Sequence, residues 1–232
     1  MAAPLRLAHR GDWRRAPENT LAALRAAIAV PACDGLEFDV RVSKDGVPVL
    51  VHDATLERVH GRPEDVGDVP SVFLEGLGIP TLAEVLAGIP GSAFLDVELK
   101  GSHDGAVVEV MATGRGPDLH RAVVSSFEPE TLERIAGLVP AWPRWFNAED
   151  LAPETIAMAV ALRCRGLSVD WRAIDESSMT RARAAGLEVA AWTVRRRPTF
   201  ARLARLGVVA ICVEAAALDG EGMHIRTAKP MP

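Results

Sequence analysis

The sequence predicts an α/β protein, a (β/α)8 barrel with a short insertion after the second barrel strand. Short β-rich runs alternate with helix-patterned runs along all 232 residues. Such alternation implies parallel strands joined by right-handed crossovers, and chains of about 200–250 residues commonly form barrels of this kind as one domain. The β-rich runs recur without a fixed repeat length, which excludes a helical solenoid.

Nine β-rich segments are expected to form strands, and eight of them fit the strand–helix units of a barrel. The nine are residues 5–9, 36–42, 47–52, 94–99, 122–127, 144–146, 167–171, 189–194 and 208–213. The segment 47–52 follows 36–42 across Asp45-Gly46, a dipeptide typical of tight hairpin turns. We therefore expect these two segments to pair antiparallel, with 47–52 decorating the barrel rim.

The stretches between the strands have helical spacing of their apolar residues. In residues 20–28, Leu21, Leu24 and Ile28 fall on one face, and Pro17 precedes the helix start. Further helices are expected over residues 129–138, 153–162, 177–185 and 199–206, the last two followed by Gly186 and Gly207. Glycine commonly occupies the position just after a helix.

Composition excludes several classes of protein. The chain has 26 basic and 31 acidic residues, a formal net charge of −5, which argues against nucleic acid as a partner. The cysteines Cys33, Cys164 and Cys212 lie far apart, so they suit neither a disulfide framework nor a zinc site. The N-terminus lacks a signal-peptide layout and no apolar run is long enough for an integral membrane segment. We expect a cytoplasmic protein.

No linker or low-complexity tract divides the chain. We therefore expect a single domain over residues 1–232, with a short inserted lobe at about 54–78 and a loose C-terminal tail at about 219–232. The sequence leaves the oligomeric state open.

Ionisable residues gather at the C-terminal ends of the expected strands, where barrels place their chemistry. Glu37 and Asp39 share one face of a strand because side chains alternate, and Glu98 and Lys100 do the same, with Asp96 deeper in the barrel. Unpaired charges there cost several kcal/mol each, so the carboxylates need cations. An all-oxygen ligand set favours Mg²⁺, Ca²⁺ or Mn²⁺ over zinc.

A purely structural ion network is the alternative interpretation of these carboxylates, with Arg10, Arg41 and Lys100 as their partners. Two neighbouring histidines favour a functional site instead. His9 and His52 lie at strand ends beside the acidic cluster, and imidazole suits acid–base work near neutral pH. The remaining histidines, at 60, 103, 120 and 224, are expected in loops or flanks.

An ordered set of motifs resembles one enzyme family, the glycerophosphodiester phosphodiesterases. The resemblance extends over about residues 5–215. The motifs are His9-Arg10-Gly11, Pro17-Glu18-Asn19-Thr20, Glu37-x-Asp39, Gly46-Val47-Pro48-Val49, His52-Asp53, Ile79-Pro80-Thr81-Leu82-x-Glu84-Val85-Leu86, Glu98-x-Lys100, Ser126-Phe127 and Trp192-Thr193-Val194.

The resemblance implies a (β/α)8 barrel that hydrolyses glycerophosphodiesters to sn-glycerol 3-phosphate and an alcohol. It implies one divalent metal ion, Mg²⁺ or Ca²⁺ with Mn²⁺ as a further possibility, bound by Glu37, Asp39 and Glu98. His9 and His52 would form the acid–base pair. The residues expected to contact the substrate or its phosphate are Arg10, Lys100 and Trp192.

The chain departs from the family pattern in two places. The segment 53–78 is shorter than the usual inserted lobe, and Val213-Glu214 replaces the usual Thr-Asp at the last strand. A short lobe leaves the barrel mouth open, so we expect weak discrimination between leaving alcohols. The alternative is a cation–π wall of Trp13, Trp171 or Trp192 that selects choline.

Two other functions remain open from the sequence. One is a related phosphodiesterase that acts on lysophospholipids or other phosphodiesters. The other is a non-catalytic barrel that binds phosphodiesters, against which the pair His9 and His52 argues, because binding alone requires no acid–base pair. The roles of the two histidines, and the choice between water and a neighbouring hydroxyl as nucleophile, also stay open.

Overall fold

The computed structural model describes residues 3–101 and 104–220. Within these ranges eight parallel strands form a closed barrel, because β1 pairs with both β2 and β9. The expected (β/α)8 barrel is therefore confirmed. The barrel strands are β1 (Leu5–His9), β2 (Gly35–Val42), β4 (Phe94–Leu99), β5 (Ala122–Ser126), β6 (Arg144–Ala148), β7 (Gly166–Asp170), β8 (Glu188–Val194) and β9 (Ala210–Val213).

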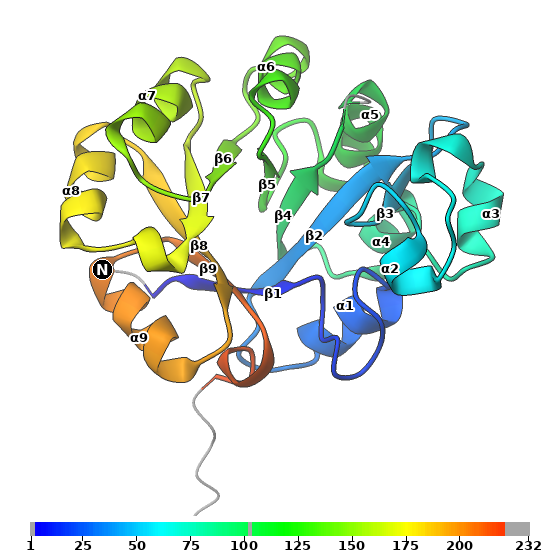
Figure 1. Ribbon diagram of the computed structural model, residues 1–232, viewed down its shortest axis with the longest axis horizontal. Coiled ribbons are helices and arrows are strands. Elements are labelled where there is room, and N and C mark those ends of the chain that lie inside the picture. The colour runs from blue at the N-terminus through cyan, green and yellow to red at the C-terminus, as the bar shows by residue number, and fades with distance from the viewer. Residues whose placement is uncertain (1–2, 102–103, 221–232) are drawn as a thin grey trace, which may run out of the picture.

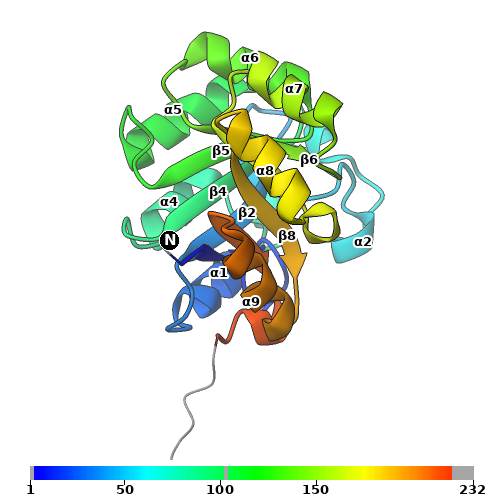
Figure 2. The ribbon, with the colours of Figure 1, turned by 90° about the vertical axis from the view of Figure 1, so that its left-hand side faces the viewer.

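Helices surround the barrel, as Figure 1 shows, and Figure 2 shows α8 and α9 against the outer side of β8. Thr20 caps the first helix by accepting a hydrogen bond from the Ala23 backbone, and Gly207 ends the last helix with a φ of 80°. These helices are α1 (Leu21–Ile28), α4 (Leu82–Gly88), α5 (Asp104–Arg115), α6 (Pro129–Leu138), α7 (Pro153–Ala161), α8 (Glu176–Ala184) and α9 (Arg197–Leu206).

The insertion after the second barrel strand begins with β3 (Pro48–Leu50), which pairs antiparallel with β2 as expected. The strand is shorter than the expected 47–52. Gly46 has a φ of 83° at the turn, a conformation that glycine adopts without strain. Three short helical segments follow, α2 (Glu57–His60), η1 (Val66–Asp68) and α3 (Ser71–Glu75). They share a small apolar cluster of their own, made of Val49, Val51, Leu56, Val66, Leu74 and Ile79.

Side chains alternate along each strand, so one set packs between the strands and the helices and the other set points into the barrel lumen. Residues such as Phe38 and Val97 point outward into the main core beneath the helices. The lower lumen is filled by a second apolar cluster, the lumen plug, formed by Leu7, Val123, Trp145, Ala190, Ala210 and Cys212. Two residues further along the strands the lumen turns polar, so the plug forms the base of a polar cavity at the carboxyl ends.

The last described segment is held against the barrel, because Arg14 donates two hydrogen bonds to Asp219. The rest of the expected tail, 221–232, lies outside the described residues, as does His103. Among the helices in the described ranges, none combines the length and the apolar character needed to cross a membrane.

Candidate active site

A cavity of about 280 Å³ opens at the carboxyl ends of the barrel strands. It brings together most of the side chains that the sequence singled out for chemistry. The ionisable residues that line it are His9, Arg10, Glu37, His52, Asp96, Glu98, Lys100 and Glu149. Asp39 lies directly behind this lining, within reach of Glu37 and Glu98.

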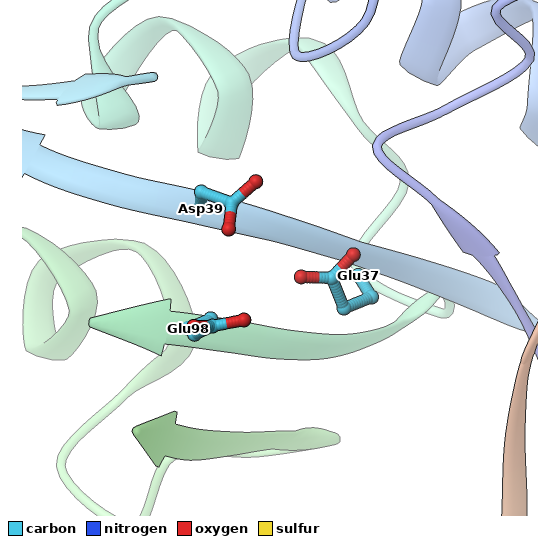
Figure 3. Close-up of side chains that lie close together, drawn as sticks. All are labelled: Glu37, Asp39 and Glu98. Carbon is cyan, nitrogen blue, oxygen red and sulfur yellow. The ribbon is translucent and has the colours of Figure 1, made fainter. Parts of the chain in front are cut away.

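The carboxylates of Glu37, Asp39 and Glu98 each offer an oxygen within 4.8 Å of the other two. Strand register explains this convergence. Asp39 is the register partner of Glu98 across the β2–β4 pair, and Glu37 precedes Asp39 by two residues on the same face. Figure 3 shows the three side chains gathered on one side of β2 and β4.

Glu37 is the least satisfied of the three carboxylates. The residue is 4% exposed, and neither carboxylate oxygen has a hydrogen-bond partner among the described residues. The His9 imidazole, which is a cation only when protonated, places its Nε2 3.8 Å from Oε2. Burial, together with the charges of Asp39 and Glu98, raises the pKa of Glu37 well above its usual value. Unpartnered buried carboxylate oxygens in an oxygen-only cluster fit the ligand set of a hard divalent cation.

Asp39 is fully buried but well partnered. Arg10 Nε lies 2.9 Å from Oδ2 and Lys100 Nζ lies 3.2 Å from Oδ1, while Asn19 Nδ2 donates to Oδ2 at 2.9 Å. Burial opposes its ionisation, yet the charges of Arg10 and Lys100 lower the pKa of Asp39 below its usual value. Asn19, part of the Pro-Glu-Asn-Thr motif, thus fixes the orientation of this carboxylate.

Lys100 also bridges to Glu98, with Nζ 2.5 Å from Oε1. Burial and the charge of Asp39 nevertheless raise the pKa of Glu98. Asp96 lies one layer lower and accepts a hydrogen bond from Ser125 Oγ at 2.6 Å. Burial raises the pKa of Asp96 to about 7. The cluster therefore holds more carboxyl groups than its local cations, Arg10 and Lys100, can pair with.

Glu214, at the end of β9, orients His9. Its Oε1 lies 2.6 Å from the His9 Nδ1, and its Oε2 accepts a hydrogen bond from Arg195 Nε at 2.7 Å. Burial opposes ionisation, but the hydrogen bonds from His9 and Arg195 lower the pKa of Glu214 to about 2. An ionised carboxylate only accepts hydrogen bonds, so the His9 Nδ1 carries its proton and Nε2 faces the cavity. In the sequence, the signal for this partner of His9 is Glu214, which stands where the family pattern given above has Asp.

His52 has a parallel arrangement. Its Nδ1 lies 2.7 Å from Asp53 Oδ1, and Asp53 in turn accepts a hydrogen bond from Arg58. Burial lowers the pKa of His52 below its usual value. Glu18 joins the two sides of the site, because it accepts hydrogen bonds from both Arg58 and Arg10.

Trp192 forms part of the cavity wall. Its indole Nε1 donates to the Ser168 carbonyl at 3.0 Å, and its ring meets Phe127 edge-on with 5.7 Å between centroids. The indole nitrogen is therefore occupied, and the ring itself is what a ligand would touch. Asn147, which the sequence did not single out, also lines the cavity with a buried Oδ1 that has no partner in the described chain.

The model for the glycerophosphoryl diester phosphodiesterase family matches residues 9–218, a range that contains every predicted site residue. The chain belongs to this family. The expected family and enzyme class are confirmed.

Individual relatives and solved structures are similar to this chain over most of its length. A glycerophosphodiester phosphodiesterase of Caldanaerobacter subterraneus subsp. tengcongensis is 27% identical over 226 residues, 90% of this chain and 93% of the relative. A solved phosphodiesterase structure from Oleispira antarctica, in complex with the product sn-glycerol-3-phosphate, has a TM-score of 0.81 and 28% identity, covering 91% and 93% of the two chains. A Thermotoga maritima glycerophosphodiester phosphodiesterase shares the fold, with a TM-score of 0.79, 24% identity and coverage of 92% and 95%.

Proposed function

We propose that this enzyme hydrolyses glycerophosphodiesters to sn-glycerol 3-phosphate and an alcohol, with His9 and His52 as the proton-transfer groups and a divalent metal ion as cofactor. One observation carries the proposal. Two histidines, each anchored through Nδ1 by a carboxylate, line the same cavity as a cluster of buried, oxygen-only ligands. The product named for the bound Oleispira relative supports this choice of substrate.

Glu37, Asp39 and Glu98 would hold the metal ion. When bound, such an ion withdraws charge from a non-bridging phosphoryl oxygen and orients the group for attack. The ligand chemistry favours Mg²⁺ or Ca²⁺, with Mn²⁺ as a further candidate. The unpartnered oxygens of Glu37 support this assignment, because two orphaned acceptors at this depth are costly without a cation.

The histidines act through their Nε2 atoms. One Nε2 takes the proton of the nucleophile, which is a water molecule or the neighbouring glycerol hydroxyl, and the other gives a proton to the departing alkoxide. Glu214 and Asp53 fix each ring through Nδ1 and stabilise its protonated form. Either attack breaks the bond between phosphorus and the oxygen of the leaving alcohol. With water as nucleophile this gives sn-glycerol 3-phosphate directly. With the hydroxyl as nucleophile it gives a cyclic phosphate, which water then opens to sn-glycerol 3-phosphate.

Arg10 and Lys100 would orient the phosphate. Both line the cavity, and both are already held by carboxylates, Arg10 by Glu18 and Asp39 and Lys100 by Glu98 and Asp39. These contacts limit the side-chain motion that ligand binding would otherwise have to restrict. Fixed cations in a cavity with little water stabilise developing charge more strongly than mobile ones.

A substrate panel tests the proposal. Glycerophosphocholine, glycerophosphoethanolamine, glycerophosphoglycerol and lysophosphatidylcholine are supplied separately, and released sn-glycerol 3-phosphate and free alcohol are measured with and without EDTA. We expect turnover of the three glycerophosphodiesters that stops in EDTA. Turnover of lysophosphatidylcholine alone would favour the lysophospholipid alternative, and binding without turnover would favour a non-catalytic barrel.

We also propose a cytoplasmic location and a single domain for the chain. The three cysteines support a reducing compartment, since all are free in the structure. Cell fractionation tests the location, and a single cooperative unfolding transition tests the domain organisation.

A further inference from the structure

A second hollow lies beside the candidate active site on the same face of the barrel. It has a volume of about 550 Å³ and is formed by the segments that follow β7 and β8. Trp192 and Thr193 line both this hollow, called here the rim groove, and the active-site cavity. A substrate that extends from the phosphate past Trp192 therefore enters the rim groove.

The rim groove is rich in arginine. Arg172, Arg195 and Arg196 line it, against the single carboxylate of Asp170. The side chains of Arg172 and Arg195 are 71% and 70% exposed, and their ion-pair partners are Asp170 and Glu214. Arg196 is also exposed, and in the described ranges it has no ion pair. The groove thus keeps a positive charge after its local pairs are counted.

Of the two tryptophans that line the groove, Trp171 is already covered by cations. The guanidinium of Arg172 lies 4.7 Å from the Trp171 ring centroid, and that of Arg202 lies 5.7 Å from it. A quaternary ammonium group needs a free aromatic face and few nearby positive charges. Around Trp171 the rim groove offers neither, which argues against a choline-selecting wall at that residue.

Guanidinium groups recognise carboxylates and phosphates through paired N–H donors. We infer that the rim groove receives the leaving alcohol of the substrate and favours alcohols that carry a carboxylate or a phosphate. The inference rests on the proposed function, since it names the substrate class of the same site. It differs from the weak discrimination expected from the short lobe at 54–78, because the rim groove adds contacts at the ends of β7 and β8.

Matched esters of sn-glycerol 3-phosphate test the inference. The leaving alcohols are 3-hydroxypropanoate, which is anionic, 1-propanol, which is neutral and similar in size, and choline, which is cationic. An ester of 2-phosphoethanol separates phosphate from carboxylate recognition. We expect kcat/KM for the carboxylate ester to exceed that for the propyl ester roughly tenfold at low salt, with the choline ester lowest. The preference should shrink in high salt, because exposed charges are screened.

The double variant R172Q/R196Q should lower the ratio of carboxylate to propyl ester rates to about one. Arg165→Gln is the matched control, because Arg165 is 60% exposed and pairs with Glu188 at the opposite end of β7 and β8. It should keep both the propyl ester rate and the ratio. Melting temperatures of all variants check the fold.

Two results would overturn the inference. One is hydrolysis of all the esters at similar rates by the unaltered enzyme, which would leave the proposed function standing. The other is an anion preference that persists in R172Q/R196Q. If none of the esters is hydrolysed in the presence of a divalent metal ion, the proposed function itself fails and takes the inference with it.

Discussion

Two charged regions meet at the mouth of this barrel, and they differ in sign and in burial. Glu37, Asp39 and Glu98 in the lumen are 4%, 0% and 9% exposed. Arg172 and Arg195 on the rim have side chains that are 71% and 70% exposed. Both regions crowd like charges together, but only the lumen buries them almost completely.

The difference teaches which charges the fold depends on. Two unit charges 4 Å apart interact by about 4 kcal/mol at an effective dielectric constant near 20, and by about 1 kcal/mol in water. The lumen carboxylates therefore require fixed partners, and Arg10, Lys100 and Asn19 supply some of them. The exposed rim arginines do not require fixed partners, because water solvates them, so the fold does not depend on their charge. Five predictions test this contrast.

Removal of the divalent metal ion should have the largest effect. Dialysis against EDTA should abolish phosphodiester hydrolysis, because the lumen carboxylates then lack their main counter-charge. Mg²⁺, Ca²⁺ or Mn²⁺ should restore turnover and raise the melting temperature. Full turnover in metal-stripped enzyme, verified by elemental analysis, would refute the metal assignment.

Loss of either histidine should come next. His9→Ala and His52→Ala should each lower kcat by on the order of 10²–10⁴. His120→Ala, a change in a loop away from the cavity, serves as the control and should keep full activity. If a variant of His9 or His52 retains the kcat of the unaltered enzyme, that histidine is structural. Steady-state kinetics with glycerophosphoglycerol measures the effect.

Glu214→Gln should have an intermediate effect, lowering kcat on the order of 10-fold with little change in KM, because Glu214 positions His9 without touching the substrate. The limb of the pH–rate profile that reports His9 should also move to lower pH, since an amide stabilises a protonated imidazole less than a carboxylate does. The pKa of about 2 keeps Glu214 itself ionised over the whole assay range.

Asp219→Asn provides the matched control for Glu214, because Asp219 also pairs with an arginine, Arg14, but contacts neither histidine. An unchanged pH profile in Glu214→Gln would show that the contact with His9 is only structural.

Glu37→Gln separates the effect of this buried carboxyl group on stability from its role in binding metal. In metal-free protein the variant should be as stable as the unaltered chain or more so, because it removes a buried carboxyl group with no hydrogen-bond partner among the described residues. With metal present, it should lose most of the metal-induced rise in melting temperature. Calorimetry with and without Mg²⁺ measures both quantities. Equal metal-induced shifts in the two proteins would show that Glu37 is not a ligand.

The smallest effect is expected on the rim. Arg172→Gln should change the free energy of unfolding by no more than about 0.5 kcal/mol, since exposed ion pairs contribute little. Chemical denaturation measures it. A loss of more than about 2 kcal/mol would mean that the arginine stack on Trp171 is part of the fold, and the contrast between rim and lumen would fail.

Much of the fold could be predicted from sequence because its signals are local. The segments 5–9, 94–99 and 129–138 match β1, β4 and α6 to the residue. The sequence pattern does not give the bounds of helix α5 (Asp104–Arg115), because Gly105 and Gly114 weaken its helical pattern. The expected strand 47–52 is shorter in the structure, at Pro48–Leu50, because its pairing with β2 ends at Leu50 and the chain then enters the inserted lobe.

The site divides in the same way. Alternation along a strand brings Glu37 and Asp39 to one face, so their convergence with Glu98 follows from strand period and order. The contact of Glu214 with His9 joins residues 205 positions apart and depends on barrel closure. The arginines of the rim groove belong to no motif, and only the loop conformations after β7 and β8 place them together.

The lumen plug closes one end of the barrel, so the active-site cavity opens only at the carboxyl ends of the strands. Leu7, Val123, Trp145 and their neighbours close the base, so nothing passes through the barrel from end to end. Products formed in the polar cavity above this plug must leave through the same opening by which the substrate enters. Substrate binding and product release therefore use the same opening, and a new substrate can bind only after the products have left.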